Sequence, residues 1–418
     1  MTVPRFSVVR PVILPILLAL ASASGCHGAK IYEVGMGGTT GTGGGGGTIG
    51  PGGGGTSASG SGSGGGGSGT GGAASSKTLV VVPGTGSSGV AYSRMTTLEN
   101  GIAYAAVLDT ADGPNAGSTP LVVVKAITLA SGSATTLSTD TEIASLFSDD
   151  RAPVAVDGTY AYWFSRTYGE TENYLHLRRA PKMGGTRDDV FAIDDAVAAA
   201  PGKPTAIATG GGYVYWASNG NGIFRCLVSP ACQNGPEPVV PTTDYIVSFI
   251  VRGDWLYWAS ASNGKVWRHG LTAPGDVMLD GGPTLGDNHA TCDIAVSADD
   301  TELWSVQCLY PYELRRVNVA AMTGTTIASA PNETSNQGSV GSLGLGTTTV
   351  YFVGSDHVFS VPRSINAATA QMLASLTTAS GVLADGIIGV DDQYVYFRGS
   401  TAGVTADPHA GYVLRMAR

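Results

Sequence analysis

The side chains of this sequence best suited to acid–base chemistry are histidines near carboxylates. His409 lies two residues after Asp407, and His289 would meet Asp150 or Glu170 if their loops converge. An imidazole beside a carboxylate can act as a general base when the substrate proton lies within about 3 Å. The sequence lacks the Gly-x-Ser-x-Gly and His-Glu-x-x-His spacings and a phosphate loop. These histidines leave open an enzyme that works by acid–base catalysis, such as a polysaccharide or lactone lyase, as the alternative to a non-enzymatic protein.

Five cysteines form a second set of reactive groups. Cys26 lies near the amino terminus. Cys226 and Cys232 flank a predicted turn, whereas Cys292 and Cys308 fall on the first and second predicted strands of one repeat. An even number in an exported chain favours two disulfides, although four cysteines allow three pairings. No Cys-x-x-Cys or His-x-x-x-His spacing supports the rival zinc site, so we expect no metal and no cofactor.

These residues must be positioned by a repeated element that fills the chain after residue 76. A turn containing Asp or Gly is followed by an aromatic strand, as in residues 157–163 (Asp-Gly-Thr-Tyr-Ala-Tyr-Trp) and 253–258 (Gly-Asp-Trp-Leu-Tyr-Trp). Seven such units follow one another at about 49 residues each, which is within the length range of propeller repeats.

Each unit holds more than its aromatic strand. A short apolar strand precedes the turn, a strand with basic residues follows a polar loop, and a fourth segment closes several units. This alternation predicts antiparallel strands throughout. Four-stranded sheets packed in a ring bury both faces of each sheet. We predict an all-β fold: a β-propeller over residues 77–418, with seven blades favoured over six or eight.

The ends of this region predict how the ring closes. The chain ends on the third strand of the last unit, residues 411–416, so that unit lacks a fourth strand. Residues 78–82 (Thr-Leu-Val-Val-Val) form an apolar strand before the first unit. Pairing of 78–82 with 412–416 would cover an otherwise open edge.

Connections between blades and loops between second and third strands gather at one end of a propeller. Loops on a rigid scaffold commonly carry binding residues, and an aromatic and acidic rim suits proteins, peptides, glycans or cationic groups. The candidate ligand-binding residues in these loops are Asp150, Arg151, Tyr168, Glu170, Asp244, Tyr245, His289, Tyr310, His357 and His409.

Acidic pairs at Asp299-Asp300 and Asp391-Asp392 have a different interpretation. They occupy the same predicted turn as Asp157, where Asp tolerates the backbone geometry and bonds its own main chain. Calcium needs six to eight oxygen ligands, and no single loop supplies them. We therefore predict turn residues, not catalytic acids or a calcium site.

Two aromatic strands carry a family resemblance. Residues 215–218 (Tyr-Trp-Ala-Ser) and 257–260 (Tyr-Trp-Ala-Ser) are each followed shortly by Asn-Gly and a third strand. They resemble the YWTD repeats of low-density-lipoprotein-receptor propellers and their bacterial relatives, with Ser where that family has Asp. The resemblance implies a binding scaffold.

The first 76 residues predict how the chain is delivered. Arg5 and Arg10 precede an apolar run of about ten residues, too short to span a membrane, and residues 21–25 (Ala-Ser-Ala-Ser-Gly) lead to Cys26. This start resembles the lipobox of bacterial lipoproteins, which implies a signal peptide over 1–25 and lipidation of Cys26. A Gly/Ser/Thr-rich segment completes 26–76, a composition typical of a flexible tether.

Composition limits the function classes. Lys plus Arg number 23 against 32 Asp plus Glu, for a net charge of −9, which excludes a general nucleic-acid binder. The sequence favours a non-enzymatic binding or interaction scaffold held to the cell envelope by a lipid anchor. In lipoproteins an Asp after the lipidated Cys favours retention in the inner membrane. Here His27 follows Cys26, so we expect the protein to be located in the outer membrane.

Overall fold

The structure is a computed structural model of the whole chain. It describes residues 77–418 except 84, 86–89, 93–96, 110–120, 144–152, 169–172, 195–203, 219, 230–231, 233–234, 282–289, 308–311, 331–340, 355–356, 367–368 and 402–410. The predicted signal peptide, Cys26 and the tether therefore lie outside the described residues, as does Cys308.

Every regular element within the described ranges is a β-strand, and the strands form seven antiparallel sheets. Blade 1 contains β2 (Val90–Tyr92), β3 (Thr97–Glu99), β4 (Ile102–Asp109), β5 (Leu121–Thr128) and β6 (Ala134–Ile143). Blade 2 contains β7 (Val154–Val156), β8 (Tyr160–Tyr168), β9 (Asn173–Pro181) and β10 (Asp188–Asp194). Blade 3 contains β11 (Pro204–Gly210), β12 (Tyr213–Ser218), β13 (Gly222–Leu227) and β14 (Glu237–Val240).

The remaining four sheets follow in chain order. Blade 4 contains β15 (Ile246–Arg252), β16 (Trp255–Ser260), β17 (Val266–Gly270) and β18 (Asp276–Asp280). Blade 5 contains β19 (Thr291–Val296), β20 (Glu302–Gln307), β21 (Glu313–Asn318) and β22 (Thr323–Ser329). Blade 6 contains β23 (Ser342–Leu345), β24 (Thr349–Gly354), β25 (His357–Pro362) and β26 (Gln371–Ser375). Blade 7 contains β27 (Val382–Val390), β28 (Tyr394–Thr401), β29 (Gly411–Ala417) and β1 (Val80–Val81).

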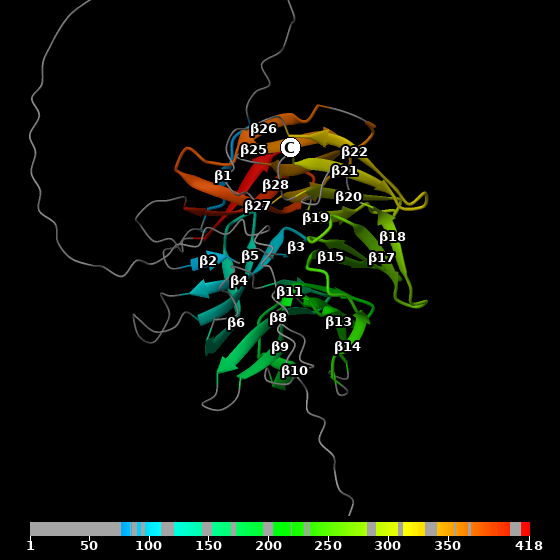
Figure 1. Cartoon of the computed structure of the whole chain (residues 1–418). Coiled ribbons are helices and arrows are strands. Elements are labelled where there is room, and N and C mark those ends of the chain that lie inside the picture. Colours follow the sequence, from blue (N-terminus) through cyan, green and yellow to red (C-terminus); the bar gives the residue numbers. More distant parts are fainter. Residues whose placement is uncertain are drawn as a thin grey trace, which may run out of the picture.

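The seven sheets close into a ring (Figure 1). Their inner strands contact one another in the order β3, β7, β11, β15, β19, β23, β27 and back to β3. In blade 1 the inner position is shared by β2 and β3, which both pair with β4. The prediction of a seven-bladed β-propeller is confirmed.

The aromatic second strands build the packing between blades because alternate residues of a strand face opposite sides of a sheet. Tyr215 packs toward blade 4 with Phe249, whereas its neighbour Trp216 packs toward blade 2 with Phe164. Tyr215 and Trp216 are both almost fully buried. One aromatic strand thus fills two interfaces, which explains why Tyr-Trp pairs recur in the repeat.

The closing strand lies within the predicted segment 78–82 but is shorter than predicted. Val80 and Val81 of β1 pair with Arg415 and Leu414 of β29. The backbone N–H of Val82 extends the pairing with a 2.8 Å hydrogen bond to the carbonyl oxygen of Val413. Leu79 and Val82 are buried, so this segment contributes core packing as well as edge hydrogen bonds.

The outer strand of each sheet would otherwise present a row of unpaired backbone groups. In blades 1 to 6 the register between the third and fourth strands shifts within the pair. In blades 4, 5 and 6 the outer-strand residues skipped at the shift are Leu279, Ile327 and Leu373, and all three are buried. These bulges twist the outer edge away from a flat template and add a side chain to the core.

Basic residues on third strands stabilise the interfaces between blades. Arg179 donates a 2.8 Å hydrogen bond to the carbonyl oxygen of Val228 in the next blade, and Arg316 bonds the carbonyl oxygen of Arg363 at 3.0 Å. Guanidinium groups also stack on aromatic rings at favourable range. The stacked pairs in which the ring begins the second strand are Arg179–Tyr160, Arg225–Tyr213, Arg268–Trp255 and Arg415–Tyr394, at 4.4 to 4.8 Å from the ring centroid.

The aspartates of the first-to-second-strand turns are structural, as predicted. Oδ1 of Asp391 accepts hydrogen bonds from the backbone N–H groups of Gln393 and Tyr394, and Oδ2 accepts one from the Tyr396 hydroxyl at 2.8 Å. Asp157 makes the same set of bonds in blade 2, with the Tyr162 hydroxyl at 2.6 Å. Burial alone would raise the pKa of both carboxyls, but these hydrogen bonds lower it below the usual value.

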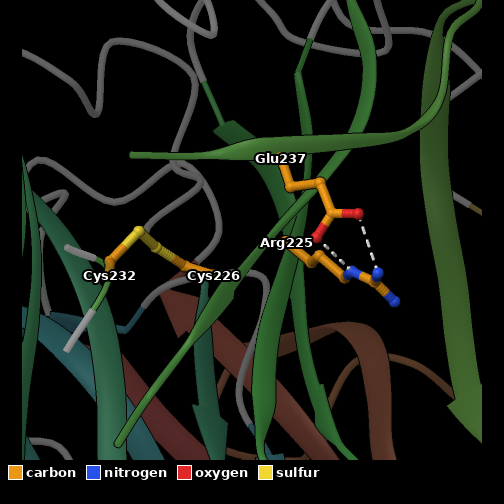
Figure 2. The surroundings of a disulfide bond; sticks show 4 residues. All are labelled: Arg225, Cys226, Cys232 and Glu237. Carbon is orange, nitrogen blue, oxygen red and sulfur yellow. Dashed lines mark hydrogen bonds and ion pairs between the residues drawn. A yellow bond between two sulfur atoms is a disulfide. The ribbon is translucent and has the colours of Figure 1, made fainter. Parts of the chain in front are cut away.

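One disulfide lies among the described residues. Cys226 at the end of β13 is bonded to Cys232 in the connection to β14, with their Cα atoms 5.3 Å apart (Figure 2). Beside it, Arg225 of β13 and Glu237 of β14 are joined by two hydrogen bonds of 2.8 and 2.9 Å. The bond is one of the pairings that the sequence left open. The Cys292–Cys308 pairing stays a prediction.

Candidate functional site

Topology gives the ring two ends with different connections. We call the end with the second-to-third-strand and blade-to-blade connections the mouth face, and the end with the first-to-second and third-to-fourth turns the turn face. Of the candidate ligand residues, Asp244 and Tyr245 lie in a described connection of the mouth face, and Tyr168 and His357 lie on strand ends there. The candidates outside the described residues are Asp150, Arg151, Glu170, His289, Tyr310 and His409.

The described mouth is best defined in blade 4. The β14–β15 connection packs on the β16–β17 connection: the backbone N–H of Ala261 bonds the carbonyl oxygen of Tyr245 at 2.8 Å, and the N–H of Tyr245 bonds Oγ of Ser262 at 3.3 Å. Nδ2 of Asn263 donates to Oδ2 of Asp244 at 3.4 Å. Asp244 and Tyr245 are half-buried, and Ser262 and Asn263 are exposed. These four residues form a polar surface that two interlocked loops hold in place.

A carboxylate just inside the mouth joins neighbouring blades. Asp293 on β19 accepts a 3.0 Å hydrogen bond from the Ser248 hydroxyl of β15 and a 3.0 Å bond from the backbone N–H of Leu343 in β23. It therefore bridges the inner strands of three consecutive blades. Thr291, two residues nearer the mouth, donates a 2.9 Å bond to the carbonyl oxygen of Gly264 in the mouth loop of blade 4.

The environment of Asp293 changes its ionisation. Burial raises the pKa of this carboxyl to about 6, even though hydrogen bonds from Leu343, Ser248 and Ile294 favour the charged form. The cost of removing a carboxylate from water exceeds the stabilisation from three donors here. Sequence reasoning missed Asp293, although an acid within the apolar strand Thr-Cys-Asp-Ile-Ala-Val was an available signal.

Two further candidates, His357 and Tyr168, lie on strand ends. His357 is half-buried, and its ring lies 6.3 Å from that of Phe359, which belongs to the core between blades 5 and 6. Tyr168 ends β8, paired with Asn173. Two further histidines, His176 and His269, lie on third strands and pair with fourth-strand aspartates, Asp189 and Asp276. The structure does not test the His–carboxylate pairs expected for a lyase, because they lie outside the described residues.

Two other features are absent from the described part of the chain. It contains no cluster of three or more His, Cys, Asp or Glu placed to hold a metal ion. Nor do the described ranges include a helix with the length and apolarity needed to cross a membrane.

Comparison with known proteins defines the class of this molecule by its fold. No family model and no curated protein sequence matches the chain. Among solved structures it is similar to U3-55K, with a TM-score of 0.53 and 10% identity over 82% of this chain and 98% of that one. It is also similar to YCF48 bound to D1 peptide, with a TM-score of 0.52 and 10% identity over 81% and 94%. The chain is a seven-bladed β-propeller, a fold consistent with a binding scaffold.

Proposed function

We propose that this protein is a non-enzymatic binding scaffold of the cell envelope, which presents the mouth of its propeller to a peptide or glycan ligand. In this proposal the chain is a lipoprotein of the outer membrane, anchored through Cys26 and separated from the lipid by the segment 26–76. The YWTD-like strands Tyr-Trp-Ala-Ser at 215–218 and 257–260 belong to the same proposal, since that resemblance implies binding rather than catalysis.

The observation that carries the proposal is the polar surface of blade 4. Asp244, Tyr245, Ser262 and Asn263 offer a carboxylate, a phenol, a hydroxyl and an amide on loops that hydrogen bonds fix to each other. Fixed side chains lose little entropy on binding, which favours affinity. A structurally similar propeller, YCF48, is described with a bound peptide, and we give a peptide priority as the ligand on that ground.

Panning a library of random displayed peptides on the full-length protein tests the mouth. We expect enriched peptides that bind Asp244→Asn and Tyr245→Ala about tenfold or more weakly, because a hydrogen bond to a charged group contributes about 1.5–3 kcal/mol. Asp254→Asn is the matched control, since Asp254 is exposed in the turn of the same blade on the opposite face. Peptides that bind the mouth variants normally but lose affinity for Asp254→Asn would contradict the proposal.

The anchor is tested separately. Expression of the whole chain and of Cys26→Ser should place the first in the membrane fraction and the second in the soluble fraction. Mass spectrometry should find acyl chains on Cys26 as the new amino-terminal residue, because more than one chain is needed for stable anchoring. An unmodified Cys26 in membrane-bound protein would disprove the lipid anchor and leave the mouth proposal standing.

A further inference from the structure

A polar hollow lies on the turn face, far from the mouth, at the outer part of blade 5. Its volume is about 220 Å³, and Glu302, Arg316, Asn318, Thr323 and Thr325 line it. These residues come from three adjacent strands, β20, β21 and β22.

Strand register explains why the five side chains share one face. Glu302 pairs with Asn318, and Asn318 pairs with Thr323 across the sheet. Two residues further along each strand, Arg316 pairs with Thr325. Residues directly opposite on neighbouring strands, and those two positions apart, point to the same side of a sheet. The lining is therefore set by pairing within one blade.

The lining holds one carboxylate and one guanidinium group, and a second arginine, Arg363, contacts that carboxylate from beside the hollow. Glu302 is contacted by two guanidinium groups, those of Arg363 at 3.1 Å and Arg316 at 3.8 Å. All three side chains are about a fifth to a quarter exposed. Because Arg363 also neutralises Glu302, the guanidinium of Arg316 can pair with an anionic group of a ligand.

The arginine that lines the hollow is held in place before any ligand arrives. Its guanidinium lies 5.7 Å from the ring centroid of Trp304. It donates to the carbonyl oxygen of Arg363 at 3.0 Å and to Oδ1 of Asn366 in blade 6. Guanidinium has five N–H donors, so Arg316 retains donors beyond these two bonds.

Neutral hydrogen-bonding groups complete the lining. Oδ1 of Asn318 accepts the backbone N–H of Ala321 at 2.8 Å, which leaves the Nδ2 amide directed away from that bond. Thr323 and Thr325 are exposed. Hydroxyls both donate and accept, so this side of the hollow suits a ligand rich in hydroxyl groups. Trp304 is fully buried, so recognition must use polar contacts rather than ring stacking.

The turn that joins Asn318 to Thr323 contains an independent anomaly. Met322 has φ +54°, and its N–H bonds the carbonyl oxygen of Asn318 at 2.9 Å. The corresponding turn of blade 1 has the same bond from Gly132, at φ +72°, to Thr128. Glycine adopts this conformation without strain and methionine does not. Strain of this kind is concentrated at functional sites, and here it adjoins the hollow.

We propose that this hollow binds a single sugar residue that carries a carboxylate, such as a uronic acid. The carboxylate pairs with Arg316, and the sugar hydroxyls exchange hydrogen bonds with Asn318, Thr323 and Thr325. The site is separate from the mouth, and it holds whether or not the mouth binds a peptide.

Calorimetric titration of the full-length protein with sodium glucuronate tests this assignment. We expect saturable binding with a dissociation constant of roughly 1 mM, and binding of glucose or sulfate at least about tenfold weaker. Asn318→Asp keeps the acceptor for Ala321 but removes the amide donor and adds a repelling charge. Thr325→Val removes a hydroxyl without changing shape. Each should weaken glucuronate binding by about tenfold, with an unchanged melting temperature.

Matched controls lie outside the hollow. Asn100→Asp in the exposed turn between β3 and β4 and Thr135→Val on the exposed outer strand of blade 1 repeat the same chemical changes and should bind glucuronate normally. Absence of saturable binding, or equal binding by the hollow variants and the controls, would overturn the site. Glucose or sulfate binding as tightly as glucuronate would overturn the acidic sugar as its ligand.

Discussion

The aspartates of the turn face and the aspartate near the mouth make contacts of different range along the chain. On the turn face, Asp391 bonds Tyr394 and Tyr396, three and five residues away. Near the mouth, Asp293 bonds Ser248 and Leu343, which are 45 and 50 residues away. The first contact can form within a single hairpin, whereas the second requires the ring to be assembled. The two kinds of aspartate therefore depend on different levels of structure.

The turn aspartates and Asp293 contribute to stability with opposite pH dependence. Folding lowers the pKa of Asp157 and Asp391 because hydrogen bonds favour the carboxylate. Folding raises the pKa of Asp293 because burial disfavours it. Stability from the turn aspartates is present above their unfolded pKa of 3.8 and is lost as pH falls. Stability from Asp293 is present below pH 3.8 and is lost as pH rises to about 6.

Deletion of residues 77–82 should cause the largest loss of stability, because this segment closes the ring. The deletion removes the outer strand of blade 7 and the buried side chains of Leu79 and Val82. At about 1.5–3 kcal/mol for each buried side chain, we expect a loss of about 3–6 kcal/mol in a urea titration. A deletion of equal length at residues 60–65 is the control. A deletion variant with wild-type stability would contradict closure of the ring by this segment.

The next largest effect should come from a buried ion pair at the mouth end. Asp280 of blade 4 receives two hydrogen bonds, of 2.8 and 3.0 Å, from Arg315 of blade 5; Asp280 is buried and Arg315 is 11% exposed. Asp280→Ala leaves an unpaired buried cation, so we expect a loss of about 3–5 kcal/mol by chemical denaturation.

Asp276→Ala is the comparison for that variant. It lies at the other end of the same strand, and it is 42% exposed beside His269. Its loss should be below about 1 kcal/mol. Equal losses for the two variants would show that the mouth end does not depend more strongly on long-range contacts.

The opposite pH dependence can be separated with Asp293→Asn. Each pKa unit corresponds to about 1.4 kcal/mol, so a pKa of 3.8 in the unfolded chain and about 6 in the folded one lowers stability by up to about 3 kcal/mol between pH 3.8 and 7. Urea titrations at pH 4 and pH 7 should show this decrease in the wild type relative to the variant. Parallel pH profiles would refute the assignment to Asp293.

The smallest effect should come from the turn face. Tyr396→Phe removes the 2.8 Å hydrogen bond to Asp391 but leaves both backbone bonds, so we expect a loss of about 1 kcal/mol in thermal unfolding. The loss should shrink as pH falls through the pKa of Asp391, which folding lowers below 3.8, because the carboxyl is then protonated. Tyr394→Phe is a suitable control because its backbone N–H, not its hydroxyl, contacts Asp391. A larger loss than that of Asp280→Ala would reverse the order of the two faces.

The fold was predictable because its signals repeat in the sequence. The turn aspartates, the aromatic second strands and the apolar segment 78–82 each occupy a fixed place in a unit, and the structure confirms the seven blades and their closure. The candidate site was less predictable. Of its described parts, Asp244 and Tyr245 follow from loop position alone, whereas the contacts of Asp293 between blades do not.

The arginines on third strands show most clearly what could not be predicted from the sequence. The sequence marks Arg179 and Arg316 as recurring basic residues. Only the structure shows that they bond carbonyl oxygens of the next blade, those of Val228 and Arg363. A side chain's partner in another unit depends on how two sheets are rotated against each other, and period and composition do not encode that rotation.

The sequence by itself determined the number of units, the strand order and the strand that closes the ring, because these follow from local alternation and from the phase of a repeat. The tertiary structure decided which distant groups meet: Asp293 with Ser248 and Leu343, and Asp280 with Arg315. Local patterns arise from backbone geometry within a few residues, whereas these contacts exist only after seven sheets have packed around one axis.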